Sequence, residues 1–165
     1  MDETNSNDSD LLAPMKSRFP EQKALVHIGA ELTDAGPGFA EISLPWSGEV
    51  TQQNGYFHAG IITMIADTAG GFAAYTLAPP ETNVLAAEFK VNFIGPAKGE
   101  RIIARAEVVK SGKRLTVCRI DIFSVEDGAE TLCALMQQTL IQVADDLNSA
   151  APTHRAGRCR VNGER

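Results

Sequence analysis

The 165-residue sequence lacks the features that mark several protein classes. It has three cysteines, an odd number without a CxxC pair, so neither a disulfide framework nor a zinc site is predicted. No apolar stretch reaches the roughly 18 residues of a membrane-spanning helix. The N-terminus has no basic region followed by an apolar run, so no secretory signal is predicted. We therefore expect a cytoplasmic protein that does not bind membranes.

Positive charge is also scarce. The formal net charge is −6, and most of it lies in the first ten residues, MDETNSNDSD. The remaining body is mildly acidic, which argues against nucleic acid as a partner. The sequence contains neither a nucleotide-binding glycine loop nor the serine-centred elbow of α/β hydrolases. We expect no metal and no resident cofactor.

Composition divides the chain into three parts. Residues 1–12 are polar and acidic, and residues 145–165 are similarly poor in apolar side chains, so both are predicted to be flexible tails. The arginines of the C-terminal tail leave an interaction arm as an alternative. Residues 13–144 have ordinary hydrophobic content and suffice for one domain with its own core.

The central part predicts an α+β fold. A short helix is expected within residues 13–26, followed by a hairpin whose turn is DAGPG. Residues 58–77 form the only long helical candidate, and they are apolar on nearly all sides. From residue 83 onward, alternation and short turns predict antiparallel strands. In the first of these strands we expect one shared face for Leu85, Ala87, Phe89, Val91 and Phe93.

A helix that is apolar on all sides must be enclosed by other elements. An antiparallel sheet curled around the helix meets this requirement, and this arrangement is the hotdog fold. A single curled sheet keeps an open edge, so we expect a homodimer or, as two dimers, a homotetramer.

Asp67 interrupts the apolar helix. A carboxylate in this setting loses hydration, which is costly unless it is paired, and partial desolvation suits a general base or nucleophile. The alternative is an aspartate that pairs with an arginine or reaches solvent. Gly70 and Gly71 each cost the helix about 1 kcal/mol relative to alanine. Another backbone approaching closely would explain them, as would an early helix end.

His58 marks the N-terminus of the same helix. The backbone N–H groups of Ala59 and Gly60 are expected to point outward there, and the helix dipole adds positive potential. Together they would form an oxyanion site for a polarised carbonyl. The alternative is that His58 only caps the helix or packs against it.

His58 and Asp67 cannot meet within one chain. Nine helical residues correspond to a rise of about 13.5 Å and a rotation of about 900°, which puts the two on opposite sides of the helix. Either only one of them is functional, or a two-fold axis brings His58 of one chain to Asp67 of the other.

One set of residues resembles a family motif: Gln52, Gly55, His58, Gly60, Ala66 and Asp67. The motif is similar to that of the hotdog-fold acyl-CoA thioesterases of the phenylacetate-pathway (PaaI-like) type. The later segments VLAAEFKVNFIGPAKGE and KSGKRLTVCRIDIF also resemble this family, so that the resemblance covers about residues 25–143.

The resemblance implies hydrolysis of coenzyme A thioesters, with coenzyme A as part of the substrate. It implies that Asp67 activates water or attacks the thioester, that the N–H of Ala59 or Gly60 polarises the carbonyl, and that two subunits build each site. The chain departs from the family in having Ala59 in place of glycine. It also has Gln52, with Asn54 nearby, in place of an asparagine, and Ala86 in place of a strand hydroxyl.

Substrate contacts can be suggested only by position. Lys98, Lys113 and Arg114 are candidates for binding the coenzyme A phosphates, and ordinary solvated turns are the alternative. Tyr56 and Phe57 are candidates for lining an acyl pocket, and a place in the core is the alternative. The acyl group itself cannot be predicted.

Two other functions remain open at this point. A hotdog hydratase would need a His–Asp or His–Glu pair in a DxNPxHxD-like segment, which is absent, and crotonyl-CoA would detect hydration. A non-catalytic binder of acyl-CoA or of an aromatic ligand would keep its ligand intact and release no thiol. The fold alone does not decide between them.

Overall fold

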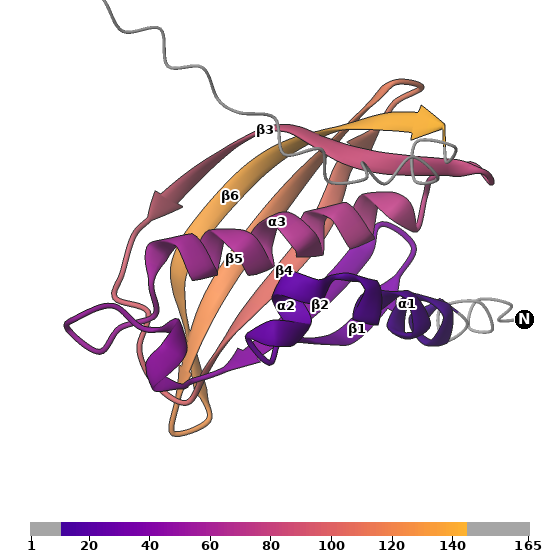
Figure 1. Cartoon of the computed structure of the whole chain (residues 1–165). Coiled ribbons are helices and arrows are strands. Elements are labelled where there is room, and N and C mark those ends of the chain that lie inside the picture. The colour runs from indigo at the N-terminus through magenta and orange to yellow at the C-terminus, as the bar shows by residue number, and fades with distance from the viewer. Residues whose placement is uncertain (1–10, 145–165) are drawn as a thin grey trace, which may run out of the picture.

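Six antiparallel strands form one sheet in the order β1-β2-β4-β5-β6-β3 (Figure 1). The computed structural model describes residues 11–144. The strands are β1 Glu31–Gly36, β2 Phe39–Pro45, β3 Thr82–Phe93, β4 Arg101–Ser111, β5 Leu115–Glu126 and β6 Ala129–Ala144. The helices are α1 Leu12–Arg18, α2 Lys23–His27 and α3 Ala59–Tyr75, with short 3-10 helices at Phe19–Glu21 and Gly48–Val50.

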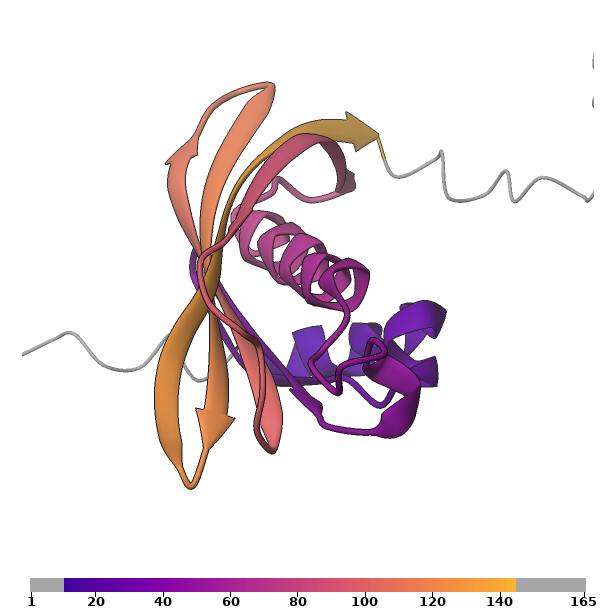
Figure 2. The ribbon, with the colours of Figure 1, turned by 90° about the vertical axis from the view of Figure 1, so that its left-hand side faces the viewer.

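The long helix α3 lies on the concave face of the sheet, with α1 and α2 on the same side (Figure 2). Its small side chains allow close packing, and Ile65, Ala66 and Ala69 are fully buried. The helix spans Ala59–Tyr75, within the predicted range 58–77, and it ends shortly before Pro79, which cannot continue a helix. The predicted α+β hotdog architecture is confirmed.

The N-terminal helices cover part of the concave face. Phe19 and Leu25 are buried as anchors, and the Phe19 ring packs on Phe72 with 5.7 Å between ring centroids. The single helix expected in residues 13–26 is divided into α1, a 3-10 turn and α2. Helix α1 begins at Leu12, which lies inside the predicted N-terminal tail and packs against the core. Residues 1–10 and 145–165, the remainder of the two predicted tails apart from Leu11, lie outside the described residues.

Strand β3 differs from the prediction by a bulge. Its register with β6 shifts by one residue at Ala87. Residues directly opposite one another share a face of the sheet. Phe89 lies opposite the buried Gln138, whereas Leu85 lies opposite the partly exposed Ile141. The predicted common face for Leu85 and Phe89 is therefore wrong, because the extra residue reverses the alternation between them.

Strand β3 also forms an open edge of the sheet. Several of its large apolar side chains are about half exposed: Leu85 at 48%, Phe89 at 46% and Phe93 at 47%. An exposed, apolar edge strand can pair with another chain.

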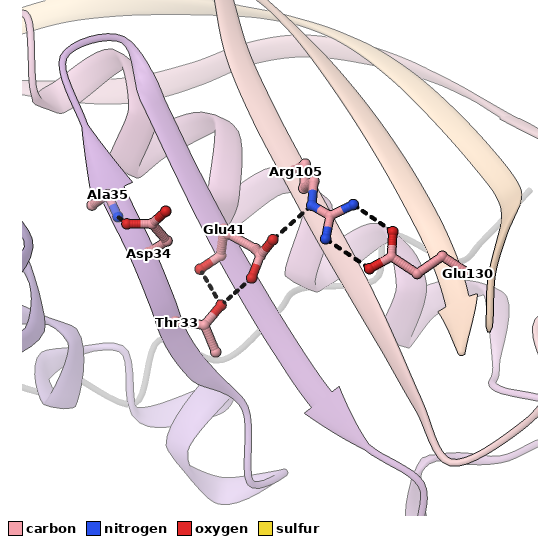
Figure 3. Close-up of polar contacts among 6 residues, drawn as sticks. All are labelled: Thr33, Asp34, Ala35, Glu41, Arg105 and Glu130. Atoms are coloured by element: carbon pink, nitrogen blue, oxygen red, sulfur yellow. Dashed lines mark hydrogen bonds and ion pairs between the residues drawn. The ribbon is translucent and has the colours of Figure 1, made fainter. Parts of the chain in front are cut away.

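The convex face carries a polar network centred on Arg105 (Figure 3). Arg105 Nε donates to Glu41 at 2.6 Å, and its two terminal nitrogens donate to Glu130 at 2.6 and 2.8 Å. Thr33 Oγ1 donates to the other Glu41 oxygen at 2.7 Å. This arginine is fully engaged in holding strands together, so we assign it a structural role.

The two cysteines within residues 11–144 are buried on the adjacent strands β5 and β6. Cys118 Sγ donates to the Gly70 carbonyl at 3.6 Å, and burial raises the pKa of the Cys118 thiol to about 12. Such a thiol stays protonated and unreactive at neutral pH. Both cysteines thus behave as small core residues.

None of the helices in residues 11–144 is long and apolar enough to cross a membrane. Nor does that part of the chain bring together three or more His, Cys, Asp or Glu side chains as a metal site.

Candidate active site

Asp67 lines a cavity of about 220 Å³ on one side of α3. The cavity lies between the second half of α3, the start of β3, the end of β6 and the end of α1. Its lining comprises Arg18, Gln22, Asp67, Thr68, Gly71, Phe72, Tyr75, Asn83, Val84, Leu85, Ala86, Gln138 and Leu140. Ala86, the residue at the place of the missing strand hydroxyl, is therefore on the same cavity as Asp67.

Gln138 of β6 is the hydrogen-bond partner of Asp67. Its Nε2 donates to Asp67 Oδ1 at 2.5 Å and to the Asp67 main-chain oxygen at 3.2 Å. Gln138 is only 1% exposed. A donor held against the carboxylate fixes its orientation and favours its ionised form. Sequence analysis missed this residue, although Gln138 occupies an inward position between Met136 and Leu140.

The two helix glycines have different neighbours. A Cβ at Gly70 would collide with the Oε1 atom of Gln138, so glycine is required for the buried amide to reach Asp67. Within this chain the close neighbour of Gly70 is a side chain, and the approach of a partner's backbone to these glycines stays a prediction. At Gly71 a Cβ would meet nothing within 4 Å. Gly71 therefore leaves room in the cavity beside Asp67.

Burial raises the pKa of the Asp67 carboxyl above its ordinary value of 3.8. Between 3.8 and the raised value, the folded chain binds more protons than the unfolded chain. The contribution of Asp67 to the free energy of unfolding therefore falls as the pH rises through that window. A neutral side chain of the same shape would remove this cost.

We accordingly expect Asp67→Asn to melt at a higher temperature than the wild type at about pH 7. The two proteins should converge as the pH approaches the ordinary carboxyl value, since wild-type Asp67 is then protonated. Scanning calorimetry over a pH series measures the difference. A lower Tm of the variant at neutral pH would contradict a desolvated carboxylate at this position.

His58 is the N-cap of α3. Its Nδ1 accepts a hydrogen bond from the Gly60 N–H at 2.9 Å, so the capping role considered for His58 is present in the structure. This contact occupies the Gly60 donor. The Ala59 N–H has no acceptor among the described residues, and His58, Ala59 and Gly60 are all exposed. Of the two predicted donors, Ala59 is thus the one left for a ligand.

The helix keeps these two features apart within one chain. Ala59 and Asp67 are eight residues apart in an uninterrupted α-helix, which corresponds to a rise of about 12 Å. The Asp67 side chain lines the cavity described above, and neither His58 nor Ala59 lines that cavity. The separation predicted from sequence is present in the structure.

The loop before His58 is ordered by its own contacts. The Gln52 side-chain oxygen accepts from the Asn54 N–H, and Gly55 adopts a left-handed conformation at φ +82°. Phe57 is 3% exposed and belongs to the core, the alternative considered for it, and it does not line the Asp67 cavity. Tyr56 is 39% exposed and lies away from the Asp67 cavity. Gln52 and Asn54 also lie outside that cavity.

The three predicted cations lie at opposite ends of the sheet. Lys98 pairs with Glu126 at 2.8 Å beside the β5–β6 turn, at the His58 end of α3. Lys113 and Arg114 lie in the β4–β5 turn, beyond the other end of the helix. None of them lines the Asp67 cavity. The cavity instead has Arg18, which sequence analysis missed because α1 is far from α3 in the chain.

A curled antiparallel sheet wrapped around one helix defines a hotdog fold, and here that helix carries a half-buried carboxylate. The family model described as "Thioesterase superfamily" matches residues 54–131. This chain belongs to that superfamily and is a thioester hydrolase, as the resemblance implies.

Three known proteins are similar to this chain. A thioesterase family protein of Silicibacter pomeroyi is 41% identical, with a TM-score of 0.76 over 78% of this chain and 94% of its own. A 1,4-dihydroxy-2-naphthoyl-CoA hydrolase of Listeria monocytogenes is 27% identical over 113 residues, 68% of this chain and 89% of its own. The PaaI protein of the E. coli phenylacetic acid degradation operon shares the fold at 19% identity, with a TM-score of 0.69 over 80% and 94% of the two chains.

Proposed function

We propose that this protein hydrolyses acyl-CoA thioesters to a carboxylic acid and free coenzyme A, with Asp67 as its catalytic carboxylate. The observation that carries the proposal is the half-buried Asp67, bound by the Gln138 amide and open to a cavity in a thioesterase-superfamily chain. The Listeria monocytogenes relative, named as a CoA hydrolase, supports coenzyme A as the leaving group.

The chemistry follows from the two ends of the site. Asp67 either takes a proton from water as the water oxygen attacks the thioester carbon, or attacks that carbon itself. Both routes need the ionised carboxylate. The Ala59 N–H at the start of α3 donates to the thioester oxygen, where negative charge develops. The bond from carbon to sulfur then breaks, and coenzyme A leaves as its thiol with the proton that Asp67 took from water. In the direct route the leaving thiolate takes a proton from solvent, and water then hydrolyses the anhydride between the acyl group and Asp67, which releases the acid and restores the carboxylate.

The proposal requires two chains. The open apolar edge of β3 pairs with the same edge of a second copy about a two-fold axis, which covers Leu85, Phe89 and Phe93. Such an axis reverses the second α3 relative to the first, so that Ala59 of one chain faces Asp67 of the other. The homotetramer expected from sequence would consist of two such dimers.

Ala86 favours one other function. The cavity-facing segment of β3 supplies alanine where a hydroxyl would position water, as expected of a protein that binds acyl-CoA without cleaving it. A thiol-release assay over short, long and aromatic acyl-CoA thioesters separates the two functions. Release of free coenzyme A by the wild type, lost in Asp67→Ala, supports hydrolysis. Tight binding of intact thioester without thiol release would establish the binder instead.

The Gln138 contact leads to a prediction about pH. Gln138→Met keeps the side-chain volume but removes the N–H that favours ionised Asp67, so the pKa of Asp67 should rise further. We expect the acid limb of the kcat/KM profile to move to higher pH, with a loss of about tenfold on the plateau from poorer orientation.

Gln137→Met is the matched control for this experiment. Gln137 is the preceding residue on β6 and is exposed on the opposite face. Its substitution should leave the profile in place. If Gln138→Met lowered the rate equally at every pH, Gln138 would have only a packing role.

A further inference from the structure

The cavity that begins at Asp67 ends at a positively charged group. Arg18, the last residue of α1, lines the cavity together with Tyr75, the last residue of α3. Arg18 Nη1 donates to the Tyr75 hydroxyl oxygen at 2.7 Å, and the guanidinium carbon lies 4.5 Å from the centroid of the Tyr75 ring. These two contacts hold the guanidinium in one orientation at the cavity wall.

The charge of Arg18 is poorly compensated within residues 11–144. Its nearest carboxylate there is Glu21, at 4.0 Å, and this glutamate side chain is 70% exposed. By contrast, Arg105 is bound by two carboxylates at 2.6–2.8 Å. Arg18 therefore keeps donors without an acceptor at hydrogen-bond distance in the described chain. Because Tyr75 accepts from Arg18, its own hydroxyl hydrogen also remains available to an acceptor.

The space between Asp67 and Arg18 suits a short chain. Asp67 and Tyr75 are eight residues apart on α3, about 12 Å along the helix. Between them, Gly71 leaves room, while Phe72 and Leu140 contribute apolar wall. The volume of about 220 Å³ is below that of sites that enclose drug-sized ligands, which are roughly 300–1,000 Å³. It accommodates an acyl group but not coenzyme A.

We propose, on the basis of the function proposed above, that Arg18 and Tyr75 bind an anionic oxygen group of the substrate at the end of the cavity remote from Asp67. This chemistry has two sources, a carboxylate at the far end of the acyl group or a phosphate of coenzyme A. The small cavity favours the acyl carboxylate. The preferred substrates are then thioesters of short dicarboxylic acids, in which Asp67 acts at one end and Arg18 binds the other.

A matched set of thioesters tests this specificity. Adipoyl and hexanoyl chains have the same number of carbon atoms and differ in their terminal carboxylate. Each is prepared on coenzyme A and on N-acetylcysteamine, a carrier without phosphates. We expect Arg18→Met to lower kcat/KM for both adipoyl thioesters about 10- to 100-fold relative to the hexanoyl thioesters. Tyr75→Phe should lower the same ratio less, and Lys16→Met, on the exposed side of α1, should not change it.

The carriers separate the two sources of negative charge. A loss for every coenzyme A thioester, with no loss on N-acetylcysteamine, would support Arg18 as an anion site but assign it to phosphate. Arg18→Met could instead change kcat/KM equally for all four substrates, or not at all, while the wild type remains active. Either result would overturn the anion site at Arg18 and leave the proposed thioesterase function intact.

If the wild type cleaves none of the four thioesters, a binding measurement still tests the anion site. That result would reject the proposed function for this panel, and titration calorimetry with intact adipoyl-CoA and hexanoyl-CoA would then test Arg18 alone. Tighter binding of adipoyl-CoA by the wild type than by Arg18→Met, without such a difference for hexanoyl-CoA, supports the anion site. A difference of equal size for both thioesters supports the phosphate assignment, and no difference overturns it.

Discussion

Asp67→Asn is expected to lower kcat for acyl-CoA hydrolysis by about 10²- to 10⁴-fold, with little change in KM. The amide has the shape of the carboxylate and can still accept the Gln138 hydrogen bond, but it can neither take a proton from water nor attack the thioester efficiently. Thiol release measured at substrate saturation gives kcat directly. The loss should be the same for every acyl group, because Asp67 acts at the thioester and not at the acyl chain.

An aspartate of the sheet, Asp121, provides the control for this substitution. Asp121 lies on the outer face of β5, where it accepts two hydrogen bonds from the exposed Arg119 at 3.0 Å. Exposed ion pairs contribute little to stability, so Asp121→Asn should retain wild-type turnover. If Asp67→Asn kept near-normal kcat while the wild type was active, the catalytic carboxylate would have to be sought elsewhere.

The fold was predictable because its main determinants are local in the sequence. The small apolar run of α3 identifies an enclosed helix, and the hairpin turns after residue 83 give antiparallel strands. The bulge at Ala87 was not predictable in this way. A single inserted residue leaves the hydrophobic pattern readable in either register, and only the pairing of β3 with β6 determines which face Leu85 takes.

The candidate site was predictable only in part, for a similar reason. Asp67 and His58 are visible because each breaks the pattern of its own element. Gln138 and Arg18 contribute through contacts that span 71 and 57 residues of sequence. The inward position of Gln138 on β6 was a local signal for a buried amide, but nothing local indicated that its partner is Asp67. Arg18 resembles any surface arginine until α1 packs beside the end of α3.

Ala59→Pro is the second substitution for which we expect a large effect. Ala59 is the first residue of α3, a position where proline fits the helix and removes only the backbone N–H. The preceding His58 already has φ −67° and ψ 136°, the extended conformation that a residue before proline requires. The variant should therefore fold and keep its helix while losing one oxyanion donor, which typically costs about 10²- to 10³-fold in kcat.

Circular dichroism and the elution volume check that Ala59→Pro retains its fold and assembly. Ala59→Gly, which keeps the N–H, should lose far less activity than the proline variant. A proline variant with wild-type kcat would show that the thioester oxygen is polarised by some other group.

The two variants together test whether each site is built from two chains. When Asp67→Asn and Ala59→Pro chains are refolded together, a mixed dimer has one site with both defects and one site with neither. Random pairing makes half of the dimers mixed, so activity should recover to about a quarter of the wild-type value. If Asp67 and Ala59 of the same chain served one site, every site would carry one defect and mixing would restore nothing. Recovery on mixing would establish that the long separation of His58 and Asp67 on α3 is bridged by a two-fold axis.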